Sequence, residues 1–340
     1  MGLGGAVLVV GECLADIKPV EVPGAVTRVA GVSQAGKSLV AFPGGGPANI
    51  AVGLARLGVP VAFAGRFARE GLGPWLLDHV TGSGVDTSFS VASPSPATIA
   101  LVTMGEAGGA TYAFYGPGTA DWQWSLDELP DAQALAGHEP PVVAVHTGSL
   151  ATALDPGAEV LAGWLGKLRR DCGVTLSYDP NVRPGLMPMD RMVSRVEAFV
   201  GLSDLVKVSL DDLEALYPGR DAERIAGRWL EGRPGVVVVT MGADGAMAWS
   251  RSGSRGMCPA PKVDVTDTIG AGDSFMSALL AHFLEQGQLS YAALAELPEP
   301  ELGSALRRAI TASAITCTRS GANPPTAAEL AGFEQHWQQK

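Results

Sequence analysis

Short runs of consecutive apolar residues, each closed by a glycine or a polar turn, constrain the fold of this chain more than any other feature. The first run covers residues 6–10, and the most uninterrupted one covers residues 236–240. A run without polar alternation is typical of a strand that is buried on both faces, as in a parallel sheet. From residue 141 onward these runs alternate with helical stretches. The pattern predicts an α/β fold whose mostly parallel central sheet has helices on both faces.

Two separate pieces of the chain predict a small additional β layer. Residues 17–43 contain short β-prone pieces between prolines and glycines, and residues 97–118 hold two alternating stretches separated by a turn. The second pattern is typical of a β-hairpin. We expect both pieces to form a small β-sheet lid over a site at the strand ends. The whole chain, residues 1–340, is then a single domain, and we expect a homodimer to form through the lid.

The composition argues against several classes of function. The chain has 24 basic and 35 acidic residues, a net charge of −11, which disfavours nucleic acid or an anionic membrane surface as a partner. No window approaches the roughly 20 apolar residues needed to cross a bilayer. The widely spaced Cys13, Cys172, Cys258 and Cys317 form no CxxC or Cys/His pattern, so we expect neither a zinc site nor a disulfide framework. We expect a cytoplasmic protein.

Residues 267–275 combine small residues, a helix start and two carboxylates. Gly270, Ala271 and Gly272 keep side chains out of the way, so that backbone N–H groups can converge on an anion where an apolar helix begins. Asp273 would repel a phosphate, but it suits a general base that takes a proton from an attacking hydroxyl. The alternative is a tight turn in which Asp273 caps the helix. This stretch alone does not separate the two.

A second glycine-rich stretch, residues 43–49, leads into another helix. Gly44 and Gly45 permit close approach of the backbone to a ligand. Asn49 can donate to and accept from a polyol, or it can act as a local cap. Asp16 follows the first strand, where ligands gather in open α/β sheets. A solvated loop acid is the alternative for Asp16.

Residues 31–38 match the phosphate-loop pattern G-x-x-x-x-G-K-[ST] at every specified position. That pattern needs a buried strand before it and a helix that opens at Lys37 and Ser38. Prolines and glycines arrive at residues 43–47, and no helix fits in the gap. We interpret the match as accidental; the alternative is a nucleotidase that depends on Lys37.

Polar residues at the ends of several predicted strands form a coherent set. Asp16 and Asn49 suit a neutral polyol, and Arg183 and Lys207 suit an anion. Asp273 would then lie between the polyol and the anion. This arrangement describes phosphoryl transfer to a hydroxyl, a reaction in which positioning and charge neutralisation supply most of the catalysis.

Residues 44–51 (GGGPANIA) and 267–275 (DTIGAGDSF) resemble the two signatures of the ribokinase-like carbohydrate kinases, also called the pfkB family. Within the family the chain is most similar to fructokinases, through residues 114–115, 146–149 and 178–183. The resemblance implies a ribokinase-like α/β fold. It also implies an ATP-dependent sugar kinase that transfers the γ-phosphoryl group to a hydroxyl of a free sugar, with fructose as the expected sugar.

The resemblance implies roles for individual residues. Asp273 is then the general base, and the backbone of Gly270, Ala271 and Gly272 is the anion hole. Many members bind a monovalent cation beside that hole, and Asp267 occupies the matching position, so ATP, Mg²⁺ and K⁺ are the expected cofactors. The remaining roles are sugar binding by Asp16, Gly44, Gly45, Asn49 and Arg183; nucleotide binding by Lys207, Ser209, Thr240, Gly242, Gly245 and Asn323; and Mg²⁺ binding through water by Asp212.

Some positions depart from the family pattern, among them Ala68 and Arg69, where many fructokinases have a Gly-x-Asp element. Two further departures concern the metal and the sugar. Asp212 stands where the N-x-x-E motif of the family has Glu, and Gly116 replaces an arginine that would face the sugar from the lid. The second departure leaves other sugars open. The alternatives are a kinase of the same family that acts on a nucleoside or on 2-keto-3-deoxygluconate, and a catalytically silent sugar-binding protein. Intact Asp273 argues against the last.

Overall fold

The computed structural model describes residues 4–20, 26–29, 32–35, 38–104 and 110–337. Its main sheet has eight strands in the order β16-β15-β14-β13-β12-β11-β1-β6. The strands from β14 to β6 run parallel to their neighbours, whereas β15 and β16 pair antiparallel, which confirms the prediction of a mostly parallel sheet. The strands are β1 (Ala6–Val10), β6 (Val61–Ala64), β11 (Val142–Gly148), β12 (Thr175–Asp179), β13 (Leu205–Ser209), β14 (Val236–Thr240), β15 (Ala246–Ser250) and β16 (Arg255–Cys258).

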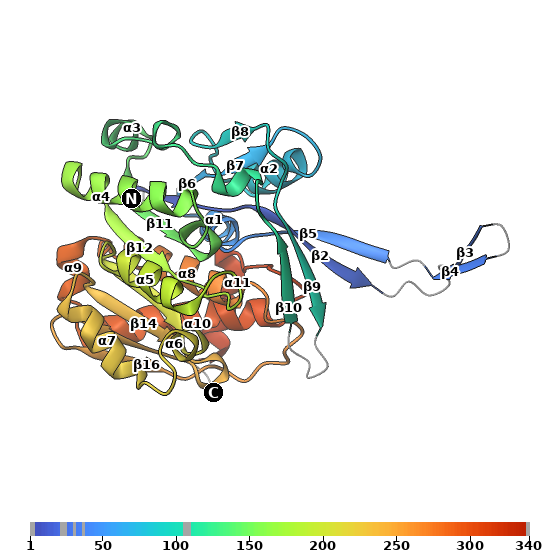
Figure 1. Cartoon of the computed structure of the whole chain (residues 1–340). Helices are drawn as coiled ribbons and strands as arrows, with labels where there is room; N and C mark the ends of the chain where they lie inside the picture. The colour runs from blue at the N-terminus through green and yellow to red at the C-terminus, as the bar shows by residue number, and fades with distance from the viewer. Residues whose placement is uncertain (1–3, 21–25, 30–31, 36–37, 105–109, 338–340) are drawn as a thin grey trace.

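Helices cover both faces of this sheet (Figure 1), as predicted. Val7 and Val9 of β1 pack in one core, and Leu8 and Val10 pack in the other, so every residue of the strand is buried. This arrangement explains the unbroken apolar runs, since neither face of a strand meets water. The first core contains α1 (Gly46–Arg56), α2 (Gly73–Gly82), α8 (Ala271–Glu285), α9 (Tyr291–Ala295), α10 (Glu299–Cys317) and α11 (Ala327–Trp337); the second contains α3 (Ala132–Gly137), α4 (Gly157–Asp171), α5 (Met189–Val200), α6 (Leu210–Leu216) and α7 (Ala222–Glu231).

A separate four-stranded sheet in the order β10-β9-β2-β5 projects from one side of the main sheet (Figure 1). Strand β2 follows β1 almost directly, pairs antiparallel with β5 and runs parallel to β9, which forms the expected hairpin with β10. Both predicted pieces of chain therefore meet in one sheet. Its strands are β2 (Leu14–Val20), β5 (Ser38–Gly44), β9 (Ile99–Met104) and β10 (Ala110–Tyr115); two further pairs are β3 (Val26–Val29) with β4 (Val32–Ala35) and β7 (Arg66–Ala68) with β8 (Val91–Ser93).

The first piece of the small sheet begins earlier and ends later than the predicted residues 17–43, because β2 starts at Leu14 and β5 ends at Gly44. Asp16 lies inside β2 opposite Phe42, and Gly44 is the last residue of β5. The alternative of a solvated loop acid for Asp16 is therefore wrong. The register explains why, because strand pairing continues through the glycine stretch until Gly46 opens α1.

The phosphate-loop match does not lead into a helix. Ser38 opens strand β5, where a phosphate loop needs the first turn of a helix. Gly31, Gly36 and Lys37 lie outside the described residues. The structure at Ser38 agrees with an accidental match.

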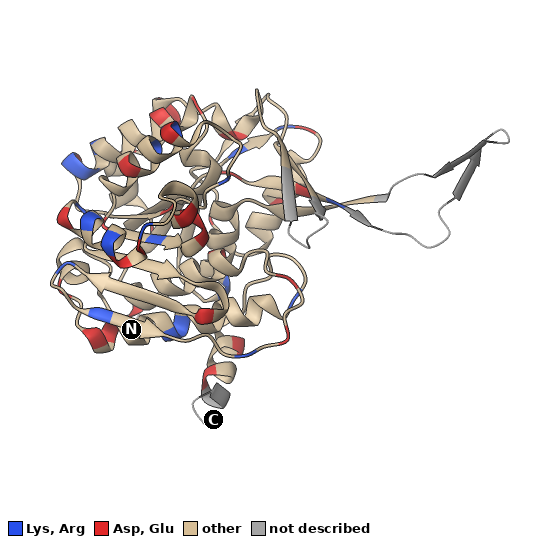
Figure 2. Cartoon of the chain, turned by 60° about the horizontal axis from the view of Figure 1, so that its bottom comes forward, with Lys and Arg blue, Asp and Glu red and all other residues tan. Residues whose placement is uncertain are grey.

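In the described part of the chain, no helix is both long enough and apolar enough to span a membrane. Figure 2 shows basic and acidic residues interspersed over the helices. The net charge of −11 is unlike the basic charge balance that is typical of nucleic-acid-binding proteins.

Candidate active site

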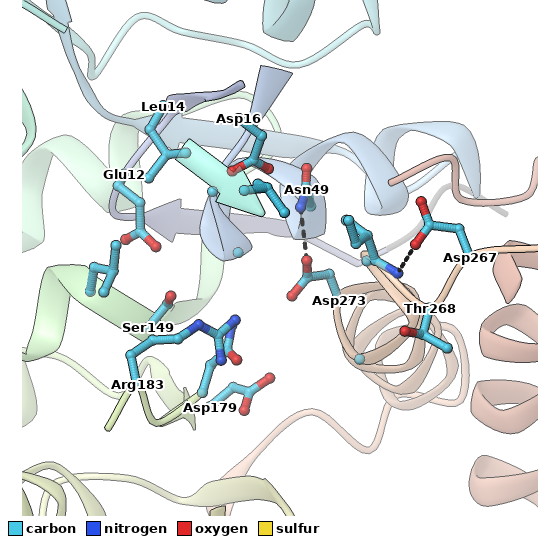
Figure 3. A pocket seen from close by; sticks show the side chains of 18 of the residues that line it. Glu12, Leu14, Asp16, Asn49, Ser149, Asp179, Arg183, Asp267, Thr268 and Asp273 are labelled. Atoms are coloured by element: carbon cyan, nitrogen blue, oxygen red, sulfur yellow. Dashed lines mark hydrogen bonds between the residues drawn. The ribbon is translucent and has the colours of Figure 1, made fainter. Parts of the chain in front are cut away.

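A cavity of about 530 Å³ lies between the strand ends of the main sheet and the inner face of the small sheet (Figure 3). Successive residues of a strand point to opposite faces, so β2 presents every second side chain to the cavity. The lining residues are Glu12, Leu14, Asp16, Lys18, Gly45, Gly46, Asn49, Val102, Phe114, Ser149, Leu150, Asp179, Asn181, Arg183, Lys207, Thr266, Asp267, Thr268, Ile269, Gly270, Gly272 and Asp273.

Asp273 lies in the first turn of α8 and faces this cavity (Figure 3). Its Oδ2 accepts a hydrogen bond from Nδ2 of Asn49 in the first turn of α1, at 2.8 Å. Gly270 holds the N-cap position of α8, so Asp273 is not the cap of its helix, and Asn49 is not a local cap either. Burial raises the pKa of the Asp273 carboxyl, which the hydrogen bond from Asn49 opposes. The two glycine-rich stretches thus meet at one carboxylate.

The glycine turn before Asp273 requires its glycines. Gly270 has φ +76°, a left-handed conformation, and a Cβ there would lie 2.7 Å from the Cβ of Ala322. Gly270 and Gly272 line the cavity. Ala271 does not, and its N–H donates to the carbonyl of Thr268 at 3.2 Å. Of the three residues of the predicted anion hole, Gly270 and Gly272 therefore line the cavity, and the role of all three stays a prediction.

A buried ion pair lies beneath this turn. Nζ of Lys207 in β13 is 2.8 Å from Oδ2 of Asp179 at the end of β12. A Cβ on Gly272 would lie only 3.0 Å from the same Nζ, so the ammonium borders the first turn of α8. Oδ1 of Asp179 is buried and has no hydrogen-bond partner among the described residues, and burial raises the pKa of this carboxyl to about 6. The site therefore offers an anion both a helix N-terminus and a lysine.

The opposite end of the cavity is lined by acids. A Cβ on Gly44 would lie 2.3 Å from Oδ2 of Asp16, so only glycine leaves room for this carboxylate across the strand pair. Burial raises the pKa of Asp16 to about 6. Arg183 lines the same cavity and exerts a favourable charge on both Asp16 and Asp273. Gly45, with φ +103°, brings the chain against the carbonyl of Glu12. The predicted sugar residues thus lie together.

Sequence reasoning assigned no role to Glu12, although it follows Gly11 at the end of the first strand. Its side chain is fully buried, and its Oε2 accepts a hydrogen bond from the N–H of Ala151 at 3.1 Å. Oε1 has no partner among the described residues. Burial raises the pKa of Glu12 to about 7. An acid directly after the terminal glycine of a buried strand was the available signal.

Two other cavity residues, Ser149 and Asn181, were also missed. Both have a positive φ, 54° and 43°, although neither is a glycine. Such backbone conformations are uncommon and concentrate at functional sites. Their strain is not visible in the sequence, because it depends on how the ends of β11 and β12 pack.

The remaining residues predicted to bind nucleotide lie outside this cavity, as far as the structure describes it. Ser209 and Thr240 end the adjacent strands β13 and β14 and pair in register. Gly242 and Gly245 form the turn that follows, with φ of 55° and 99°. Asn323 accepts a hydrogen bond at its Oδ1 from Nη1 of Arg56 at 2.5 Å. Their nucleotide role stays a prediction.

The two residues predicted to contact metal ions are differently placed. Asp212 lies outside the cavity, and its oxygens accept hydrogen bonds from the N–H groups of Val182 and Ser209, at 2.8 and 3.1 Å. It completes a capping box with Ser209, which does not favour its predicted role at Mg²⁺. Asp267 does line the cavity, and its Oδ2 lies 3.4 Å from Nζ of Lys18.

The described residues contain no group of three or more His, Cys, Asp or Glu side chains that could hold a metal ion. Magnesium is usually held by one or two carboxylates together with substrate phosphates and water. Asp179, with its unpaired Oδ1, fits that mode better than Asp212 does. A monovalent ion at Asp267 would need backbone or phosphate oxygens in addition to the carboxylate.

A family model described as pfkB family carbohydrate kinase matches residues 6–329. A fructokinase of Rhizobium leguminosarum bv. trifolii is 32% identical over 297 residues, which cover 87% of this chain and 85% of that protein. Fructokinase-1 of Oryza sativa subsp. japonica is 32% identical over 332 residues, 94% of each chain. The crystal structure of a Xylella fastidiosa fructokinase with bound ATP superposes with a TM-score of 0.86 at 28% identity, covering 99% of this chain and 100% of that one. The family match spans both glycine-rich stretches and the strands between them, and the chain belongs to the pfkB family of carbohydrate kinases.

Proposed function

We propose that this protein is an ATP-dependent fructokinase, which transfers the γ-phosphoryl group of ATP to a hydroxyl of free fructose. The observation that carries the proposal is the placement of Asp273. Its carboxylate, oriented by Asn49, lies between Asp16 of β2 and the glycine turn at the start of α8. A sugar hydroxyl and a phosphoryl group can therefore meet at this carboxylate.

Asp273 acts as the general base. The proton of the attacking hydroxyl passes to one Asp273 oxygen while the hydroxyl oxygen forms its bond to phosphorus and the bond to the leaving ADP oxygen breaks. Burial raises the pKa of this carboxyl above its usual value, which makes it a stronger base at neutral pH than an exposed aspartate. The hydrogen bond from Asn49 fixes the carboxylate orientation.

The negative charge of the phosphoryl group is met by Gly270, Gly272 and Lys207. The glycine turn presents the N-terminal end of α8, and Lys207 adds a buried ammonium beside it. Mg²⁺, when bound with the nucleotide, would neutralise phosphate charge, and Asp179 is the carboxylate best placed to hold it. An ATP-consuming reaction fits the cytoplasmic location expected from the sequence.

Two observations favour fructose over the alternative substrates. Relatives that share 32% identity with most of this chain are named fructokinases. Five acidic and three basic side chains line the cavity, so a neutral polyol is favoured over a sugar acid such as 2-keto-3-deoxygluconate. The apolar side chains of Leu14, Val102 and Phe114 complete the wall and suit the C–H face of a sugar ring.

We also propose that the small sheet is a lid within one domain and that a second copy of the chain packs on its outer face. Ile17, Ala41 and Leu101 share that face by register, and the side chains of Leu39 and Tyr115 on it are 55% and 61% exposed. An uncharged apolar face avoids the repulsion that the net charge of −11 would otherwise impose. Light scattering after size exclusion should give a dimer for the wild type and a monomer for Leu39→Glu with Tyr115→Glu; a monomeric wild type contradicts this proposal.

The substrate is tested by an ATP-depletion screen over ketoses, aldoses, sugar acids and nucleosides, with and without K⁺. Fructose should give the highest kcat/KM. Turnover with a nucleoside or a keto-acid sugar, without ATP consumption in the presence of fructose, would overturn the assignment to fructose. Binding of a sugar without any phosphoryl transfer would instead support a catalytically silent sugar-binding protein.

A further inference from the structure

Lys18 is a cavity residue to which neither the sequence motifs nor the proposed reaction assigns a role. It lies on β2, two residues beyond Asp16, so both side chains point to the same face of the small sheet. Its Nζ is 3.4 Å from Oδ2 of Asp267, an interaction drawn as the dashed line that ends on Asp267 in Figure 3. The small sheet thereby reaches across the cavity to the segment that leads into the glycine turn.

Asp267 does not depend on this contact for its hydrogen bonds. Its Oδ1 accepts from the N–H of Ile269 at 3.0 Å, and its Oδ2 accepts from the N–H of Gly321 at 2.9 Å. Burial would raise the pKa of Asp267, but these two backbone bonds and the charge of Lys18 lower it. The carboxylate is therefore charged and firmly held before any ligand arrives.

Lys18, in contrast, has only weak contacts, and its Nζ also lies over the ring of Phe42, 5.6 Å from the ring centre. A distance of 3.4 Å is longer than an ordinary N–H···O hydrogen bond, and an ammonium has three protons to donate. The two side chains are 25% and 20% exposed, so the ion pair alone contributes little stability. The ammonium can turn to a stronger acceptor within the cavity at small cost.

The spacing along β2 suits two different substrate groups. Residues two apart on a strand are roughly 7 Å apart. Asp16 lies at the sugar end, and Lys18 faces Asp267, which precedes the glycine turn at the phosphoryl end. The charge of Lys18 also acts on Asp16, whose pKa it lowers against the effect of burial. One strand of the small sheet thus extends over both reacting partners.

We propose that Lys18 is a further catalytic residue, a cation carried by the small sheet that leaves Asp267 to contact the oxygens of the phosphoryl group during transfer. This inference rests on the proposed kinase function. Lys18 transfers no proton in this step: the hydroxyl proton goes to Asp273, and the electron pair of the breaking P–O bond stays on the leaving ADP oxygen. The ammonium of Lys18 adds a positive charge from the small sheet to that of Lys207 in the main sheet, and both residues line the cavity.

The test compares Lys18→Met and Lys18→Arg with Lys167→Met, a control at an exposed position of α4. With the best sugar of the screen, Lys18→Met should lower kcat about 10- to 100-fold, less than the loss of a fully buried oxyanion donor. KM for the sugar should change less than about threefold, because the contact forms with the phosphoryl group. Lys18→Arg should recover most of kcat, and Lys167→Met should leave it unchanged.

A second measurement separates failure of this inference from failure of the kinase assignment. Calorimetric titration of the wild type with ATP and with ADP needs no sugar, and absent ATP binding would overturn the kinase assignment itself. If ATP binds, an unchanged kcat in Lys18→Met overturns the role of Lys18. A rise in sugar KM at constant kcat also overturns it, because Lys18 would then only fasten the small sheet to Asp267.

Discussion

The two walls of the cavity are built differently. The wall formed by the main sheet and α8 holds Asp273, Lys207 and Asp179, all buried, in elements that pack between two helical layers. The wall formed by the small sheet holds Asp16 and Lys18, on a sheet whose outer face exposes Leu39 and Tyr115. Groups that perform chemistry need tight positioning, which a close-packed core supplies. Asp16, which we propose binds the sugar, lies on an element with fewer packing constraints.

This contrast predicts a division in kinetics. Substitutions in the wall of the main sheet should lower kcat, whereas substitutions at the sugar end of the small sheet should raise KM. Lys18 is the exception in the small sheet: its substitution should lower kcat, because we propose that it contacts the phosphoryl group.

The largest effect is expected for Asp273→Asn. Loss of the general base should lower kcat about 10²- to 10⁴-fold while sugar binding persists, because the amide keeps the shape and can still pair with Asn49. Steady-state kinetics and calorimetric sugar titration measure the two quantities. Asp171→Asn, at the exposed end of α4, is the control. Unchanged kcat in Asp273→Asn would remove the chemical role from the wall of the main sheet.

Gly270→Ala should follow, with a loss in kcat of about 100-fold, because a small displacement of reacting groups has such a cost. The new Cβ would have to push Ala322 away, and the alanine at position 270 would have to adopt a positive φ. Gly58→Ala is a matched control, since Gly58 also has a positive φ, +80°, but a Cβ there meets no atom within 4 Å. Both variants should lose thermal stability, and only Gly270→Ala should lose kcat. Equal kcat in the two variants would show that the turn does not position the phosphoryl group.

Asp16→Asn should raise the sugar KM about 10-fold, with a smaller change in kcat. A charged acceptor for sugar hydroxyls is replaced by a neutral amide on the small sheet, and hydrogen bonds to charged groups contribute roughly 1.5–3 kcal/mol. Initial rates over a range of sugar concentrations separate the two constants. The opposite result, a loss confined to kcat, would erase the contrast between the walls.

The smallest effect concerns Glu12, at the junction of the two sheets. Burial raises its pKa from 4.5 to about 7, so the folded state favours the protonated form, and the stability from Glu12 is lost as pH rises from about 4.5 to about 7. Glu12→Gln keeps the shape without ionising. Its melting temperature relative to the wild type should therefore rise across this pH window and level off above it. A difference that stays constant between pH 4.5 and 8 would mean that Glu12 is charged throughout.

Most of the fold could be read from the sequence because burial on both faces leaves an unambiguous apolar run, as in β14. The glycine-rich turn and the helix start at Asp273 could also be predicted from the sequence, since few residue types suit a helix start that faces an anion. The role of Asp212 at Mg²⁺ stays a prediction, because a capping box and a metal-binding motif can share the same spacing. The bounds of β2 and β5 were predicted incorrectly because these strands contain proline and glycine, which are typical of loops.

Contacts between residues far apart in the chain could not be predicted from the sequence. The pairing of Asp179 with Lys207 depends on the register of β12 and β13, and the approach of Lys18 to Asp267 depends on how the small sheet folds over the main one. Neither pair has a local sequence pattern. Both arise from topology, which single residues do not encode.

The hydrogen bond between Asn49 and Asp273 joins residues 224 positions apart in the chain. A ribosome makes the chain from the N-terminus, so Glu12, Asp16 and Asn49 emerge long before α8. A nascent chain that ends before α8 lacks both the base and the glycine turn, and also the helix whose side chains fill the core beside α1. The proposed phosphoryl transfer therefore needs α8 to have been made and folded against α1, and a shorter nascent chain lacks the complete site.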